Sequence, residues 1–215
     1  MSNSDFLKKK KAHLEHITAA FHGLNEKYSL LKPMLFDDDL FNTHNNYGFT
    51  VIRQSLFFNC VIDIVNIIKK GDKKTPSIES ISEIFLCEPT IKTLHDDIVN
   101  FDAFKGIKSL EKFQSKAFTE NVKKTEEDIK NLLGLEMYKC FVTIRDKRIA
   151  HLELKYIQGE YQLLDISTLN IAWTDLEIII NKLKIIVTNL NIALTGVNIA
   201  DRDKVNEKMK NKFWY

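Results

Sequence analysis

Residues that end helices and form tight turns are scarce in this chain, which has 7 glycines and 3 prolines among 215 residues. A many-stranded sheet needs frequent turns, so this scarcity favours a few long helices. Hydrophobic residues make up 44% of the chain and charged residues 28%, as in soluble globular proteins rather than disordered ones. The sequence therefore predicts an all-α fold in one helical domain.

Hydrophobic periodicity locates the expected helices at 4–32, 47–70, 77–86, 90–104, 107–118, 119–154 and 174–195. Pro33 is expected to help end the first of them, and Gly134 to break the longest. An Asp- and Asn-rich loop is predicted over 35–46, and 156–168 is the one strand-like or irregular stretch. We expect a helical domain at 1–200, followed by a charged C-terminal tail at 201–215.

Charge and cysteine usage narrow the functional classes. The formal net charge is only +2, so any contact with nucleic acid must come from a local basic patch. Cys60, Cys87 and Cys140 are widely spaced, which indicates free thiols in a reducing cytoplasm rather than a disulfide framework. The most apolar segment, 176–194, contains lysines and asparagines that disfavour a membrane span.

Several polar clusters have no convincing site chemistry. His13 and His16 lie one helical turn apart and lack a third metal ligand, so we expect solvated helix residues. The run Asp37–Asp39 lacks the glycine and glutamate of a calcium loop, and Lys8–Lys11 is typical of a solvated helix start. A glycine-rich phosphate loop is missing as well. No metal and no cofactor is expected.

A polar stripe on the second long helix has two interpretations. Its members step by three or four residues: Ser55, Asn59, Asp63, Asn66 and Lys70. The stripe either faces water or a polar seam, or lines a cleft shared with the run described next.

The most concentrated polar chemistry lies in a seven-residue run inside an otherwise apolar helix: Arg145, Asp146, Lys147, Arg148 and His151. An imidazole transfers protons near neutral pH, and a guanidinium binds phosphate oxygens in a fork geometry. In RNA the 2′-hydroxyl is an internal nucleophile, so cleavage of the phosphodiester needs only positioning, proton transfer and charge stabilisation. The run is either such a site or a solvated charged stripe.

Helix geometry constrains the first of these interpretations. At about 100° per residue, Arg145 and His151 project roughly 120° apart on one ideal α-helix. They converge poorly within one copy unless the helix ends or distorts there. Two copies across a two-fold axis would bring the same segment twice into one cleft. If the run is catalytic, we expect a homodimer.

The run resembles the signature of the HEPN superfamily (higher eukaryotes and prokaryotes nucleotide-binding). That signature is an Arg separated from a His by four to six residues, and Asp often follows the Arg, as Asp146 follows Arg145. The longer form, RDK-x-x-AH, comes after the apolar segment VIRQSLFFNCVIDIVNII and the segment SIESISEIF. In this order it is similar to the abortive-infection, or phage-defence, branch of the superfamily over residues 5–195.

The resemblance implies an all-α HEPN-type bundle of about four or five core helices, usually dimeric, that acts as a metal-independent endoribonuclease. Such proteins serve as phage-defence effectors, or as toxins beside a nucleotidyltransferase antitoxin. It implies that Arg145 stabilises the scissile phosphate, that His151 is the general acid or base, and that Asp146 orients the site. On electrostatic grounds we add Lys147 and Arg148 as RNA-binding residues. The alternative is a non-catalytic RNA- or partner-binding module of this fold.

Overall fold

The computed structural model describes residues 3–44, 46–69, 71, 74–99, 107–150, 154–157, 160–163 and 165–199. Its α-helices are α1 (Asn3–Phe36), α2 (Asp38–His44), α3 (Tyr47–Ile68), α4 (Ile78–Ser82), α5 (Glu88–Val99), α6 (Lys108–Gly134), α7 (Glu136–Thr143) and α8 (Trp173–Thr195). Two short 3₁₀ helices, η1 (Glu83–Leu86) and η3 (Ile166–Leu169), and a π-helical segment, η2 (Ile144–Ala150), complete the helical part. The predicted all-α fold is confirmed. The predicted tail at 201–215 lies outside the described residues.

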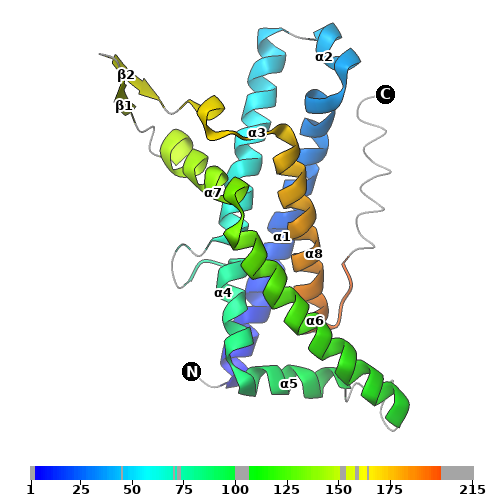
Figure 1. Ribbon diagram of the computed structural model, residues 1–215. Coiled ribbons are helices and arrows are strands. Elements are labelled where there is room, and N and C mark those ends of the chain that lie inside the picture. Colours follow the sequence, from blue (N-terminus) through cyan, green and yellow to red (C-terminus); the bar gives the residue numbers. More distant parts are fainter. Residues whose placement is uncertain are drawn as a thin grey trace.

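A small antiparallel hairpin accompanies the helices and occupies part of the stretch expected to be strand-like. Strand β1 (Leu154–Ile157) pairs with β2 (Glu160–Leu163), with Leu154 opposite Leu163. The hairpin stands apart from the bundle near the end of α7 (Figure 1). The predicted end of the long helix at Leu154 is therefore wrong, because Leu154 belongs to strand β1.

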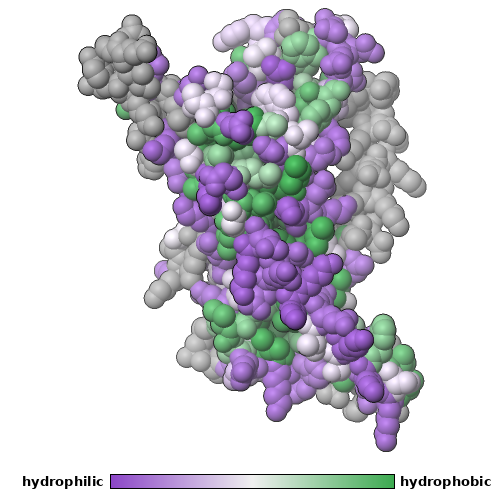
Figure 2. Space-filling model, in the orientation of Figure 1, coloured by the Kyte–Doolittle hydropathy of each residue, from purple (hydrophilic) through white to green (hydrophobic). Residues whose placement is uncertain are grey.

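The core lies where α1 packs along α3 and α8, with α6 crossing α8 (Figure 1). Apolar residues form a stripe along α8 at steps of three and four positions, and all are buried within this one chain: Leu176, Ile179, Leu183, Ile186, Leu190 and Ala193. That burial shows that the stripe serves the bundle core. The outer face of α6 forms a hydrophilic band across the front of the molecule (Figure 2).

Helices α3 and α8 are long and apolar enough to cross a membrane by length and composition alone, with mean hydropathies of 1.5 and 1.4. Both contribute their apolar residues to the core, and these include Ile64 and Ile68 of α3 and Val187 of α8. The core helix of a soluble bundle is expected to have this composition. Packing thus explains the apolar residues in the second half of α3 and along α8, whereas Val51 and Ile52 near the start of α3 are exposed.

The expected loop at 35–46 contains a helix, and Pro33 does not end α1. The helix continues to Phe36, with Pro33 inside it. Asp37 then caps the N-terminus of α2, because its carboxylate Oδ1 accepts a hydrogen bond of 2.9 Å from the backbone N–H of Leu40. An Asp before a helix satisfies one of the N–H groups that have no partner within the helix. The acidic run is thus a helix cap, exposed to solvent as expected.

The long helix predicted over 119–154 is interrupted directly after Gly134, as expected. Leu135 adopts an extended backbone, with φ −66° and ψ 132°, and separates α6 from α7. Upstream of this break, the two helices predicted at 107–118 and 119–134 are one continuous helix, α6. The interruption gives α7 a direction of its own, which places its C-terminal end beside α3.

Lys10 departs from the prediction that the run Lys8–Lys11 is solvated. Its side chain is buried between α1 and α4, where the ammonium group donates to the backbone carbonyl of Ser80, to Ser80 Oγ at 3.1 Å and to Glu83 Oε2 at 2.7 Å. His13, one turn further, is also buried rather than solvated, and its Nδ1 lies 3.4 Å from the same Ser80 Oγ. Burial lowers the pKa of His13, and the charge of Lys10 lowers it further.

The three cysteines are free, as expected. Cys60 of α3 is buried in the core, and this burial raises the pKa of its thiol to about 12. Cys87 and Cys140 are only partly buried. Of the three cysteines, only Cys60 is fully buried.

We predict that Lys10→Met lowers the free energy of unfolding by about 1–3 kcal/mol, because the oxygens of Ser80 lose a buried donor. Urea unfolding followed by circular dichroism measures this change. Lys8→Met is the matched control, since Lys8 is exposed on the same helix and its replacement should change stability by less than about 0.5 kcal/mol. Equal effects of the two substitutions would contradict a structural role for Lys10.

Candidate active site

The polar run begins where α7 changes from α-helix to π-helix, at Ile144. Phe141 and Ile144, just before the run, are completely buried, and the Phe141 ring meets Phe57 of α3 edge to face with centroids 6.5 Å apart. The π-helical segment η2 is also in contact with α3. π-Helical turns are rare and occur frequently at functional sites. The buried residues Phe141 and Ile144 thus fix the π-helical segment, with its polar residues, beside α3.

Arg145 and Asp146 form a close ion pair within η2. The Arg145 Nε donates to Asp146 Oδ1 at 2.7 Å, and its Nη2 lies 2.5 Å from the same oxygen. The side chains are 22% and 38% exposed, so both are accessible to a ligand. A carboxylate that binds the guanidinium in this way fixes its orientation at the surface. Asp146 is therefore placed to orient Arg145.

Lys69 brings a second cation to this pair from a different part of the chain. It follows directly after α3, and its Nζ lies 3.9 Å from Asp146 Oδ2. Asp146 thus lies between two cations, Arg145 on one oxygen and Lys69 near the other. The described part of the site therefore has more positive than negative charge, as a site for an anion requires.

Tyr138 of α7 lies two helical turns before Arg145, and its side chain is buried. Its hydroxyl is fully buried and has no hydrogen-bond partner among the described residues. Burial raises the pKa of Tyr138, and the negative charge of Glu79 in α4 raises it further, whereas Arg145 lowers it. The phenol is therefore a neutral group within the electrostatic field of the Arg145–Asp146 pair.

The other predicted site residues are placed less completely. Lys147 and Arg148 lie in η2 and are partly buried. Arg148 is close enough to Asp165 to lower the pKa of that carboxyl, although hydrogen bonds from Ser167 lower it more. Arg145, Asp146 and Lys69 are thus brought together, while Arg148 also acts toward the segment before α8. His151 lies outside the described residues.

The polar stripe of α3 fits the interpretation of a solvated or polar face. Ser55, Asn59 and Asn66 are exposed, and Asp63 accepts a hydrogen bond from Lys27 Nζ of α1 at 2.6 Å. Lys70, the last predicted member, lies outside the described residues. Among the described residues, no three His, Cys, Asp or Glu side chains come together as a metal site.

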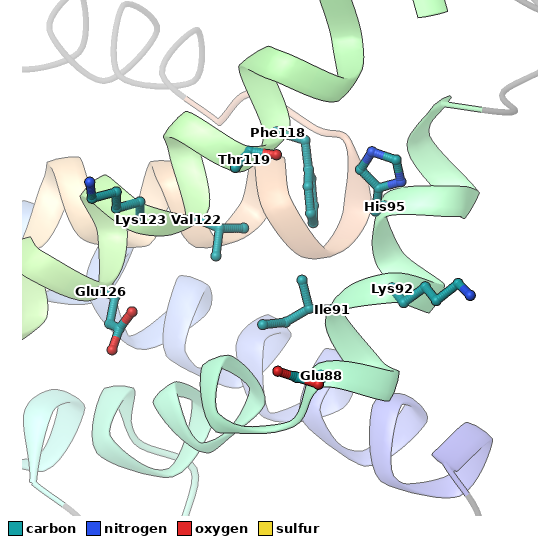
Figure 3. Close-up of a pocket in the computed structure, with 9 residues that line it drawn as sticks. All are labelled: Glu88, Ile91, Lys92, His95, Phe118, Thr119, Val122, Lys123 and Glu126. Atoms are coloured by element: carbon teal, nitrogen blue, oxygen red, sulfur yellow. The ribbon is translucent and has the colours of Figure 1, made fainter. Parts of the chain in front are cut away.

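A separate groove of about 370 Å³ lies between α5 and α6, away from η2 (Figures 1 and 3). Ile91, Phe118 and Val122 point into it, and the lysines at its rim, Lys92 and Lys123, point away. His95 borders the groove, and its Nε2 lies 2.8 Å from Ser115 Oγ. The floor of the groove is apolar, and its charged residues are two lysines and two glutamates, Glu88 and Glu126, which balance each other.

Sequence reasoning did not identify Lys69 and Tyr138. Lys69 stands directly before Lys70, the last residue of the predicted stripe, but its approach to Asp146 is a tertiary contact. Tyr138 shares a helix face with Arg145 at a spacing of seven residues, which is a signal that the sequence does contain. The spacing alone does not show that the hydroxyl is buried without a partner.

Comparison with known proteins identifies one family. The family model described as AbiU2, of the HEPN type, matches residues 7–207 of the chain. No curated protein and no solved structure matches it. The matched region includes the described bundle from Leu7 onward and the run that contains Arg145 and His151.

We predict that Tyr138→Phe leaves the free energy of unfolding unchanged or raises it by up to about 1 kcal/mol, because the hydroxyl is buried without a partner. Tyr138→Ala, which also removes the ring, should lower it by about 3–5 kcal/mol. Urea unfolding of both variants tests this. A loss of more than about 1 kcal/mol in Tyr138→Phe would mean that the hydroxyl does form a hydrogen bond.

Proposed function

Because the chain belongs to the AbiU2 family, in the abortive-infection branch of the HEPN superfamily, we propose that it is a metal-independent endoribonuclease acting in phage defence. The observation that carries the proposal is the partly exposed Arg145 guanidinium, oriented by Asp146 and next to a second cation. This arrangement suits a phosphate group. The family match supports a role in abortive infection.

In the proposed reaction, the 2′-hydroxyl of RNA attacks the adjacent phosphorus and the bond from phosphorus to the 5′-oxygen breaks. His151 exchanges the protons, taking one from the 2′-hydroxyl or giving one to the leaving 5′-oxygen. Arg145 stabilises the extra negative charge of the pentacoordinate transition state. The products are a 2′,3′-cyclic phosphate and a 5′-hydroxyl, and no metal ion takes part.

Asp146 has a specific role in this mechanism. Since its Oδ1 binds both Nε and Nη2 of Arg145, the guanidinium keeps its other N–H groups for the phosphate. Asp146 is thus a positioning residue that acts through Arg145. Lys147 and Arg148 are proposed to bind the RNA backbone on either side of the scissile phosphate.

We further propose that the active unit is a homodimer, in which the run from Arg145 to His151 enters one cleft from each copy. The same chemistry would serve a toxin of a toxin–antitoxin pair. A nucleotidyltransferase-type protein would then be its antitoxin, and both would work in the cytoplasm.

The nuclease is tested by incubating purified protein with total RNA in EDTA. We expect cleavage by the wild type, and a loss of at least about 100-fold in His151→Ala and Arg145→Ala, because proton transfer and charge stabilisation each contribute this much. Mass spectrometry of the products should find 2′,3′-cyclic phosphate ends.

Lys139→Ala is the matched control, because Lys139 is a cation of α7 paired with Glu136 at 2.9 Å and exposed on the surface. It should cleave like the wild type. Cleavage that depends on added metal, or that survives both active-site substitutions, would refute the nuclease. RNA binding without cleavage would instead indicate a non-catalytic binding module.

The dimer is tested by sedimentation equilibrium at micromolar concentrations, where we expect twice the mass of one chain. Arg145→Ala should keep this mass, since it removes a side chain of the site and no core packing. A monomer that cleaves RNA at full rate would contradict a shared cleft.

A further inference from the structure

The ammonium group of Lys69 is close to Asp146 but is not hydrogen-bonded to it. The distance from Nζ to Oδ2 is 3.9 Å, beyond the usual range of about 2.7–3.2 Å for a hydrogen bond from nitrogen to oxygen. The side chain is 42% exposed, and its ammonium group forms no hydrogen bond with the described residues. Within the described part of the chain, its three N–H donors are therefore available to water or to a ligand.

The charges around Asp146 are unequal. One carboxylate lies between two cations. Nε and Nη2 of Arg145 both contact the same carboxylate oxygen, Asp146 Oδ1. Lys69 remains near the other oxygen at a distance where the attraction through water is weak. A single added negative charge would neutralise the group of three.

We propose that Lys69 is a phosphate-binding residue of the active site and that it holds an RNA phosphate together with Arg145. This inference rests on the proposed function. The phosphate site would then be formed by two parts of the chain: Lys69, which follows α3, and the π-helical segment η2 at the end of α7. The packing of α3 against η2 brings the two cations to the same carboxylate, Asp146, when no RNA is bound.

The two cations suit different parts of this task. The guanidinium is planar and binds two oxygens in a fixed fork, whereas the ammonium is a point charge on a flexible stem. A phosphodiester offers two non-bridging oxygens and one negative charge. Arg145, held by Asp146, is placed to orient the phosphate, and Lys69 can turn toward the remaining oxygen.

The alternative explanation of Lys69 is structural. A cation at the C-terminal end of a helix interacts favourably with the helix dipole, typically by about 0.3–1 kcal/mol, and Lys69 is the C-cap of α3. That role would affect the stability of the fold and would leave RNA affinity unchanged. The two explanations therefore differ in what the loss of the ammonium group changes.

The test measures RNA binding without cleavage, in the His151→Ala background. A short fluorescein-labelled single-stranded RNA is titrated by fluorescence anisotropy at several salt concentrations. Each phosphate contact on a single strand contributes about 0.7 to the slope of log affinity against log salt. We expect Lys69→Met to lower the slope by about 0.7 and to weaken binding about fivefold at 0.1 M salt.

Lys130→Met is the matched control, because it removes the same charge from an exposed residue of α6 that pairs with Glu126 at 2.8 Å. It should leave affinity and slope unchanged, and Lys69→Arg should retain most of both. Lys69→Gln is a second neutral variant, and melting temperatures check that each variant is folded. If Lys69→Met binds RNA like Lys130→Met, or if no variant binds RNA, the inference is wrong.

This result is separate from the nuclease test. Salt-dependent binding that requires Lys69, without cleavage by the wild type, would refute the nuclease and support the phosphate site. Cleavage that requires His151, together with RNA binding that does not depend on Lys69, would support the nuclease and refute the phosphate site.

Discussion

The burial of Phe141 and Ile144 is the constraint on which the geometry of the polar run depends. Both side chains are inaccessible to solvent, and Phe141 is fixed against Phe57 of α3. Because Phe141 lies in the last turn of α7 and Ile144 begins η2, their burial leaves Arg145 and Asp146 at the edge of the core. Arg145 thus lies between the packed core on one side and solvent on the other.

Hydrophobic periodicity was sufficient to predict the major helices, because each buries one apolar stripe with a spacing that the sequence displays directly. The same reasoning failed for Pro33 and Lys10, where packing overrides a local preference. A proline is tolerated within α1, and a lysine is buried because Ser80 and Glu83 of another element accept its hydrogen bonds. Such partners are distant in sequence, and no local pattern indicates them.

The candidate site likewise contains one contact that the sequence indicates and one that it does not. Arg145 and Asp146 are adjacent in sequence, so their pairing follows from a local motif. Lys69 meets them only because α3 and η2 pack together, a contact that depends on the whole fold. The ideal-helix angle between Arg145 and His151 does not apply as calculated, because the segment up to Ala150 is π-helical. A distortion of the helix, one of the two routes to convergence considered from the sequence, is present in the described part of the run.

The extended residue between α6 and α7 has a consequence for how this family can vary. In one continuous helix, inserting a single residue would rotate everything downstream by about 100° and turn Arg145 away from Lys69. Leu135 interrupts that helix, so the rotational phase of α7 is set by its own contacts with α3. The long helix can therefore gain or lose residues during evolution while the segment that carries Arg145 and Asp146 keeps its orientation.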